Sequence, residues 1–235
     1  MRVVSLVPSA TETLLALGVT PVACTRFCEQ PGIPTVGGTK NPDLGAIVDL
    51  APDLVVVNDE ENRREDADAL VAAGIALHSM SPRSFADVGP AVAALAAAVG
   101  VRVAFPAGEP AAPVASGPAD AAVRRRCVVF VWRRPWMTLG TDTYAASLLS
   151  GLGCDQVAFG VPGDRYPEVA LDAVAAAAPD LILLPDEPYA FDDRHRAEVA
   201  AAVPGAEVLL VDGRDLFWWG VRTPGAFERL RAALA

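Results

Sequence analysis

The chain contains one stretch twice: residues 44–60, LGAIVDLAPDLVVVNDE, return as residues 171–187, LDAVAAAAPDLILLPDE, at an offset of 127 without a gap. Each copy predicts a short helix, a Pro-Asp turn, a strand and an acidic loop. The predicted strands are apolar without alternation, which is typical of a parallel sheet covered on both faces. We therefore expect an α/β protein of two similar lobes, each a mostly parallel sheet covered by helices, with a ligand cleft between them.

A second echo supports the duplication. Residues 3–8, VVSLVP, resemble residues 126–135, RCVVFVWRRP, and a helical segment that ends near a glycine follows each of them. Pro8 and Pro135 are again 127 residues apart. Two matches at one offset indicate a common origin more strongly than a single match in an alanine-rich chain.

Proline and glycine mark the boundary between the lobes. Four prolines and two glycines fall within Phe105–Pro118, and this composition disfavours both helices and central strands. The sequence therefore predicts an N-terminal α/β lobe at residues 1–83, a connecting helix and Pro/Gly-rich linker at residues 84–122, and a C-terminal α/β lobe at residues 123–235.

Two capping-box patterns predict where helices begin. Ser9-Ala-Thr-Glu12 would open a helix that runs to Leu17, and Ser84-Phe-Ala-Asp87 would open one that runs to about Val99. In a capping box the serine hydroxyl accepts a hydrogen bond from a backbone amide of the first turn.

Charge and hydropathy exclude two classes of partner. The net charge is −10 and the isoelectric point is near 4.6, with no basic stripe that could replace the counterions of a nucleic acid. No run of about 18 apolar residues is present, so the sequence predicts no membrane span. Met1-Arg2 leads directly into a predicted strand without a secretory signal, and we expect a cytoplasmic protein if Met1 is the natural start and an extracytoplasmic one otherwise.

The cysteines and histidines do not form a recognisable site. The four cysteines are too few for a disulfide scaffold, and Cys24-x-x-x-Cys28 lacks the spacing of zinc and redox motifs. Cys127 is expected to be a small buried side chain, and Cys28 is the one thiol in a predicted loop. His78 is expected in an apolar strand and His195 on an exposed helix start, so no metal site is predicted.

Aromatic and charged residues gather after the predicted strands. Parallel α/β sheets bind ligands beyond the carboxyl ends of their strands, and all four tryptophans fall in segments at such ends. Large aromatic side chains at loop ends line a cleft or, alternatively, cap the core of their own lobe. The predicted ligand-binding residues are Phe27, Thr39, Lys40, Glu60, Trp132, Arg133, Trp136, Tyr166, Glu187, Tyr189, Trp218, Trp219 and Arg222.

Six segments carry a resemblance to a known family: VSLVPSATE at 4–12, LGVTPV at 17–22, LAPDLV at 50–55, LVAAGI at 70–75, PEV at 167–169 and PDLI at 179–182. In these segments the chain resembles the helical-backbone substrate-binding proteins of ABC importers, a group that includes vitamin B12-binding and iron–siderophore-binding proteins. The chain is most similar to the cobalamin-binding branch. Four further segments indicate a leaderless subgroup of that branch: residues 36–42, 60–63, 132–137 and 187–191.

The resemblance implies two lobes and a shallow cleft that holds a bulky chelate by aromatic and hydrogen-bonding contacts. The ligand would be cobalamin, another corrinoid or another metal chelate, with no intrinsic cofactor and no catalytic residue. An ABC importer is the partner that the family implies. One of the two carboxylates that vitamin B12-binding proteins offer to their transporter falls at Gly45, and the other falls at Asp172. The family's rigid helix between lobes is replaced by Phe105–Pro118.

The main expectation is thus a small-molecule binding protein, in which aromatic residues stack on a flat macrocycle and Lys40, Arg133 and Arg222 meet its acidic substituents. One alternative is a cytoplasmic enzyme on the same scaffold that uses Glu60, Glu187 or Cys28. Another is an interaction module that buries a Trp218–Trp219 patch against a partner chain. Adjacent acids on a loop are, however, usually solvated or placed at a helix N-terminus.

Overall fold

The computed structural model describes residues 1–102 and 124–235, which divide into two compact units. The first unit contains Met1–Pro82, residues 87–102 and Trp218–Thr223, and the second contains Arg83–Ala86, residues 124–217 and Pro224–Ala235. Their positions relative to one another are not determined, so the expected cleft between lobes stays a prediction. The expected connector, Phe105–Pro118, lies outside the described residues.

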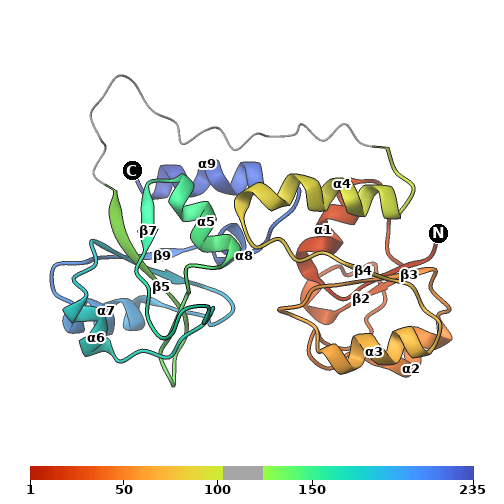
Figure 1. The fold of residues 1–235 in the computed structure, drawn as a ribbon, viewed down its shortest axis with the longest axis horizontal. Helices are drawn as coiled ribbons and strands as arrows, with labels where there is room; N and C mark the ends of the chain where they lie inside the picture. The colour runs from red at the N-terminus through yellow and green to blue at the C-terminus, as the bar shows by residue number, and fades with distance from the viewer. Residues whose placement is uncertain (103–123) are drawn as a thin grey trace. The chain divides into compact units, whose positions relative to one another are not determined.

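The first unit is built on a four-stranded parallel sheet of order β2-β1-β3-β4. The strands are β1 (Val3–Ser5), β2 (Ala23–Cys24), β3 (Leu54–Val57) and β4 (Leu77–Ser79), and the helices are α1 (Pro8–Ala16), the 3-10 turn η1 (Arg26–Cys28), α2 (Leu44–Asp49), α3 (Arg64–Ala72) and α4 (Val88–Ala98). Figure 1 shows α2 and α3 on one side of this sheet and α1 on the other.

The second unit repeats this arrangement with one additional strand. Its strands are β5 (Arg125–Trp132), β6 (Met137–Thr138), β7 (Cys154–Gln156), β8 (Leu181–Pro185) and β9 (Glu207–Val211), and its helices are α5 (Tyr144–Gly151), α6 (Leu171–Ala176), α7 (Asp193–Ala202) and α8 (Gly213–Phe217). The parallel strands run in the order β7-β5-β8-β9, which matches β2-β1-β3-β4, and β6 pairs antiparallel with the end of β5. The last helix is α9 (Thr223–Ala233).

The two cores confirm the fold class and the duplication. The buried strands β3 and β8 and the helices α2 and α6 occupy matching positions of the repeat, 127 residues apart. In the first core Ile47 of α2 packs with Val55 and Val57, and in the second Val174 packs with Ile182 and Leu184. Each uniformly apolar strand is thus buried as its sequence predicts.

The second echo, however, is aligned differently from the sequence prediction. Val3 pairs with Leu54 in one sheet, and Cys127 pairs with Leu181 in the other, so the first strands correspond at an offset of 124 rather than 127. Pro8 begins α1, whereas Pro135 lies in the turn between β5 and β6. The turn to β6 follows β5 before α5 begins, and this insertion makes the Pro8–Pro135 spacing a coincidence.

The turn between helix and strand has the same backbone conformation in both copies. Ala51 and Ala178 have left-handed φ values of 44° and 47°, and each precedes a buried proline, Pro52 or Pro179. A proline disfavours the right-handed helical conformation of the residue before it, so each helix ends there. This conformation costs an alanine about 1 kcal/mol, which the packing of the turn must offset.

The capping-box prediction at Ser9 is wrong. Helix α1 begins at Pro8 with Val7 as its N-cap, because proline fits the first helical turn, and the Ser9 hydroxyl is buried without a hydrogen-bond partner among the described residues. At the second pattern a 3-10 turn, Phe85–Asp87, begins directly after Ser84 and leads into α4 at Val88, so the capping box at Ser84 stays a prediction. The capping-box pattern alone does not show at which residue a helix begins.

None of the helices within residues 1–102 and 124–235 combines the length and the apolarity that a bilayer crossing needs.

An aspartate joins the two central strands at the start of each sheet. Asp53 Oδ2 accepts a hydrogen bond from the Arg2 backbone nitrogen at 2.6 Å, and Asp180 Oδ2 accepts one from the Arg126 backbone nitrogen at 2.7 Å. Asp53→Ala should lower the free energy of unfolding by about 1 kcal/mol, because it removes a charge-assisted acceptor. Urea unfolding followed by circular dichroism measures this change.

The matched control is Asp49→Ala, which changes an exposed aspartate at the end of α2 and should stay within about 0.5 kcal/mol of the wild type. Equal destabilisation by the two variants would contradict the proposed contribution of Asp53.

Candidate functional site

In the second unit, an exposed tryptophan lies at the carboxyl end of the central strand. Trp132 is the last residue of β5 and is 43% exposed, and its ring meets Tyr189 edge-on at a centroid distance of 5.4 Å. Tyr189 follows β8, the neighbouring strand in the sheet. Parallel strand order therefore brings together two residues that are 57 positions apart in the sequence.

Further aromatic rings pack between the Trp132–Tyr189 pair and the core of the second unit. Tyr189 contacts Phe191 at 4.7 Å, and Phe191 lies parallel to Trp136 at 6.0 Å. Trp136 in turn contacts Phe130, which is fully buried in β5. A phenylalanine buried in this way contributes about 1.5–3 kcal/mol. Trp136 and Tyr189 are thus partly core residues. Within this one cluster some aromatic rings cap the core of their unit, whereas Trp132 lies on the surface.

Arg133 is fixed beside the same cluster by a carboxylate. Its Nη2 donates to Glu198 Oε1 at 2.8 Å and to Oε2 at 2.7 Å, and its guanidinium lies 5.3 Å from the centre of the Trp136 ring. The hydrogen bond to Glu198 raises the pKa of Arg133. Glu198 lies on α7, and nothing in the sequence beyond its place on this helix indicated that it would pair with Arg133.

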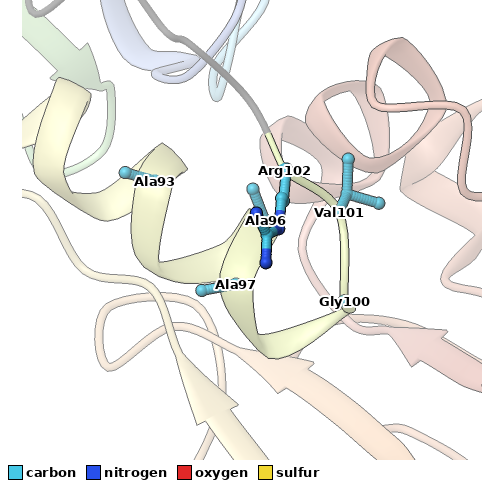
Figure 2. A pocket seen from close by; sticks show the side chains of 6 residues that line it. All are labelled: Ala93, Ala96, Ala97, Gly100, Val101 and Arg102. Atoms are coloured by element: carbon cyan, nitrogen blue, oxygen red, sulfur yellow. The ribbon is translucent and has the colours of Figure 1, made fainter.

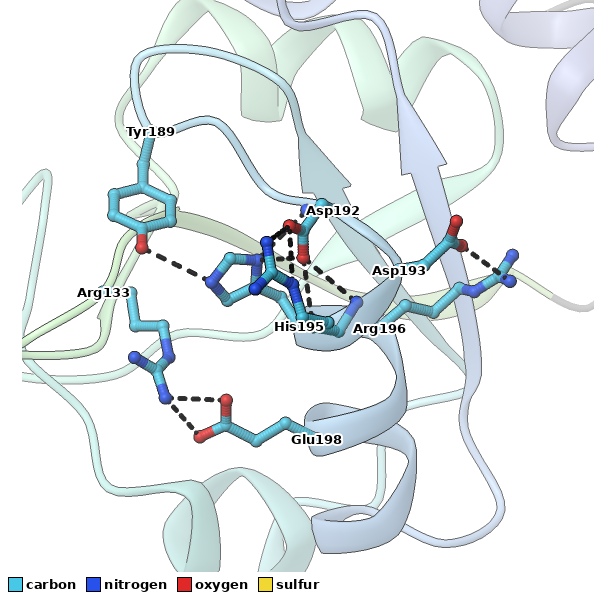
Figure 3. Close-up of polar contacts among 8 residues, drawn as sticks. Arg133, Tyr189, Asp192, Asp193, His195, Arg196 and Glu198 are labelled. Atoms are coloured by element: carbon cyan, nitrogen blue, oxygen red, sulfur yellow. Dashed lines mark hydrogen bonds and ion pairs between the residues drawn. The ribbon is translucent and has the colours of Figure 1, made fainter.

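His195 completes the cluster, and its predicted exposure is wrong. Its side chain is only 16% exposed, because its ring packs edge-on against Tyr189 and Phe191. As Figure 3 shows, Nε2 lies 3.4 Å from the Tyr189 hydroxyl, while Nδ1 lies 3.1 Å from the Asp192 backbone nitrogen. The signal in the sequence was the spacing Asp192-x-x-His195, a capping box with histidine as its third helical residue.

Two further predicted residues of the second unit lie on neighbouring loops. The Tyr166 backbone nitrogen donates to Asp164 Oδ1, and the side chain is half-buried. Glu187 is half-buried and pairs with Arg214, with 3.6 Å between Oε2 and Nε. Gly213 is required beside it, since a Cβ at that position would lie 2.6 Å from the Glu187 carbonyl oxygen.

In the first unit, two asparagines organise the loop after β3. Asn58 Oδ1 accepts from the backbone nitrogen atoms of Glu60 and Glu61, and Asn62 Oδ1 accepts from the Asn58 nitrogen. Asn62 Nδ2 donates to the Thr39 carbonyl at 3.0 Å and so joins this loop to the glycine-rich loop before α2. Sequence reasoning missed both asparagines, although an Asn directly after a buried strand is a typical turn signal.

The remaining predicted residues of the first unit form two groups. The Lys40 Nζ donates to the Glu60 carbonyl oxygen, and Phe27, in η1, is 48% exposed. Near the C-terminus Trp219 is buried, whereas Trp218 is half-buried under Arg222, whose guanidinium lies 5.5 Å from the centre of the ring. Arg222 itself donates to both oxygens of Glu12, at 2.9 and 2.7 Å.

All four cysteine side chains are buried, and none of them forms a disulfide. Cys28 is the last residue of η1, and its Sγ is 3.2 Å from Thr11 Oγ1 and 3.3 Å from Thr25 Oγ1. Burial raises the pKa of the neighbouring Cys24 to about 12, with a smaller contribution from Cys28. Cys127 is fully buried in β5, as predicted, and burial raises its pKa to about 12 as well.

An open hollow of about 560 Å³ lies along α4 in the first unit. As Figure 2 shows, small side chains and one arginine line it: Ala93, Ala96, Ala97, Gly100, Val101 and Arg102. It contains none of the predicted binding residues. Within the described parts of the chain, no group of three or more His, Cys, Asp or Glu side chains could hold a metal ion.

Solved structures of similar fold include proteins described as vitamin B12-binding and as heme-binding. The periplasmic vitamin B12 binding protein of Vibrio cholerae superposes with a TM-score of 0.77 at 20% identity, covering 99% of this chain and 96% of its own. A periplasmic heme-binding protein in complex with two hemes gives 0.77 at 24% identity (100% and 99%), and the apo form of another from Roseiflexus sp. RS-1 gives 0.75 at 21% (99% and 97%).

These matches show that the chain has the fold of these periplasmic binding proteins, with parallel sheets covered by helices. No protein-family model and no curated protein matches the sequence.

The Asp192 carboxylate should stabilise the second unit in a pH-dependent way. Although desolvation opposes ionisation, hydrogen bonds from the His195 and Arg194 backbone and the nearby positive charges lower the pKa of Asp192 below 3.8. Its contribution is therefore full above the unfolded-state value and is lost as the pH falls through the lower folded-state pKa. Asp192→Ala should lower the urea midpoint at pH 7, and the difference from wild type should shrink on acidification below pH 3.8.

Asp193→Ala is the matched control, because Asp193 is the adjacent aspartate and its side chain is 77% exposed. A midpoint difference for Asp192→Ala that is constant between neutral and acidic pH would contradict the capping contribution.

Proposed function

We propose that this protein binds a bulky, flat metal chelate, with a corrinoid such as cobalamin or a heme as the ligand, and that it does so without an intrinsic cofactor. The observation that carries the proposal is the exposed Trp132 ring, held edge-on by Tyr189 at the carboxyl end of β5. The likeness in fold to proteins described as vitamin B12- and heme-binding supports the choice of ligand class.

A fixed exposed indole favours stacking on a planar ligand. Its position is defined by Tyr189, which packs on the buried Phe191, so little side-chain freedom is lost on binding. The aromatic face offers a large apolar area, and the Tyr189 hydroxyl beside it adds a polar group. This combination of apolar surface and few polar groups is typical of small-molecule sites.

The proposal covers ligand binding and does not extend to delivery to a membrane importer. Gly45 and Asp172 occupy the same position of the repeat, as the second residues of α2 and α6, and both are exposed. A partner that requires a carboxylate on each lobe finds only Asp172. The proposed function is therefore ligand binding without the pair of docking carboxylates that the resemblance implies.

Ligand titrations test the proposal directly. Purified protein is titrated with cyanocobalamin, heme and a ferric siderophore, and binding is followed by absorbance and by quenching of tryptophan fluorescence. At least one of them should bind, and Trp132→Ala should weaken that binding about fivefold to tenfold, because an aromatic contact is worth about 0.5–1.5 kcal/mol.

Val161→Ala is the control, since it removes another exposed apolar side chain, 71% exposed, in a loop of the same unit. Binding of none of the three ligands, or equal losses in both variants, would refute the proposal.

A further inference from the structure

The two arginines expected to meet acidic ligand groups are already occupied. Arg133 donates twice to Glu198, and Arg222 donates to both oxygens of Glu12. A ligand carboxylate at either guanidinium would compete with a carboxylate that the protein itself supplies. Cations without such a partner are better candidates for an acidic ligand.

Arg26 and Lys40 are two such cations, and both are exposed in the first unit. The Arg26 guanidinium lies 4.7 Å from the centre of the Phe27 ring, and Lys40 Nζ donates to the Glu60 carbonyl oxygen. Neither forms an ion pair with a carboxylate of residues 1–102 or 124–235. Most other described arginines of this acidic chain do form such pairs, with Arg2, Arg102, Arg126 and Arg134 among the exceptions.

The glycine-rich loop before α2 contacts Arg26 and carries Lys40. The Arg26 backbone nitrogen donates to the Gly37 carbonyl oxygen at 2.9 Å. Gly38 lets the guanidinium approach the loop, because a Cβ at this position would lie 3.1 Å from Arg26 Nη2 and 2.6 Å from Asn41 Oδ1. Lys40 is two residues further along the same loop.

The Phe27 ring is exposed, yet the turn that carries it is anchored. Residues on either side, Thr25 and Cys28, are buried and joined by a hydrogen bond between Oγ1 and Sγ of 3.3 Å. Thr11 contacts the same Sγ at 3.2 Å and ties the turn to α1. The ring thus stays on the surface, 48% exposed, because its neighbours hold the turn in place.

We propose that Arg26, Phe27 and Lys40, here called the Arg26 surface, bind the carboxylate-bearing edge of a planar ligand. The guanidinium and the ammonium receive the carboxylates, and the Phe27 ring packs against the ligand plane. The choice of a planar macrocycle rests on the proposed function, and the Arg26 surface by itself favours one with carboxylate side groups, such as a porphyrin dicarboxylate, over a corrinoid whose side groups are amides.

A comparison of acid and ester isolates the carboxylate contacts. Protoporphyrin IX and its dimethyl ester, both metal-free and in the same detergent, are titrated into wild type, Arg26→Gln and Lys40→Gln. Wild type should prefer the acid, and each variant should lose about twofold to fivefold in affinity for the acid only, as expected for exposed charge-assisted contacts. Thermal melting verifies that the variants remain folded.

Arg64→Gln is the matched control, because Arg64 is an exposed arginine of the same unit that pairs with Asp68 on α3. Arg26→Lys keeps the charge and should retain part of the preference for the acid. Equal affinities of wild type for acid and ester, or an equal loss in Arg64→Gln, would overturn the inference.

The outcomes separate this inference from the proposed function. Binding of cobalamin without any dependence on Arg26 would leave the proposed function standing and overturn the Arg26 surface. Arg26-dependent binding of the free porphyrin acid, with no binding of any metal chelate, would do the reverse. Absence of binding for every ligand would overturn both.

Discussion

The fold depends on one contact that occurs in both sheets, where an aspartate locks the first strand to the strand after the repeat helix. Asp53 and Arg2 exchange hydrogen bonds in one sheet, and Asp180 and Arg126 do so in the other. Each arginine side chain also donates to the carbonyl at the end of the preceding helix, Leu50 or Ala177. The contact therefore holds the repeat helix, the turn after it and the two central strands of each sheet together. The loops at the other ends of these strands are positioned as a result.

From this shared scaffold the two units diverge at their strand ends. In the second unit β5 turns back into β6, and the turn carries Trp136 over Phe130, so the strand ends bear a packed aromatic cluster. In the first unit α1 follows β1 directly, and the loops are joined instead by Asn62, which binds the Thr39 carbonyl. The duplication accounts for the two similar sheets. The strand ends differ because the second unit has the additional strand β6, and because Asn58 and Asn62 organise the loops of the first unit.

Much of the candidate site was visible in the sequence, since Trp132, Trp136 and Tyr189 are conspicuous aromatic residues after apolar strands. Their partners were not visible. His195 and Glu198 are ordinary helix residues until α7 packs against the sheet at β9 and brings them against Tyr189 and Arg133. Charge was equally ambiguous, because the composition shows an excess of acid but not that Glu198 and Glu12 occupy the arginines expected to meet the ligand.

The sequence by itself determined the α/β class, the duplication, and the positions of the buried strands β3 and β8, because unbroken apolar runs after a Pro-Asp turn have few other stable arrangements. Only the tertiary structure decided the register of the first strands, the helix starts at Pro8 and Val88, and which cations lack a carboxylate. These features depend on hydrogen bonds and ion pairs between distant residues. A local sequence pattern shows which chemical groups a residue carries, but not which distant residue those groups will contact in the folded protein.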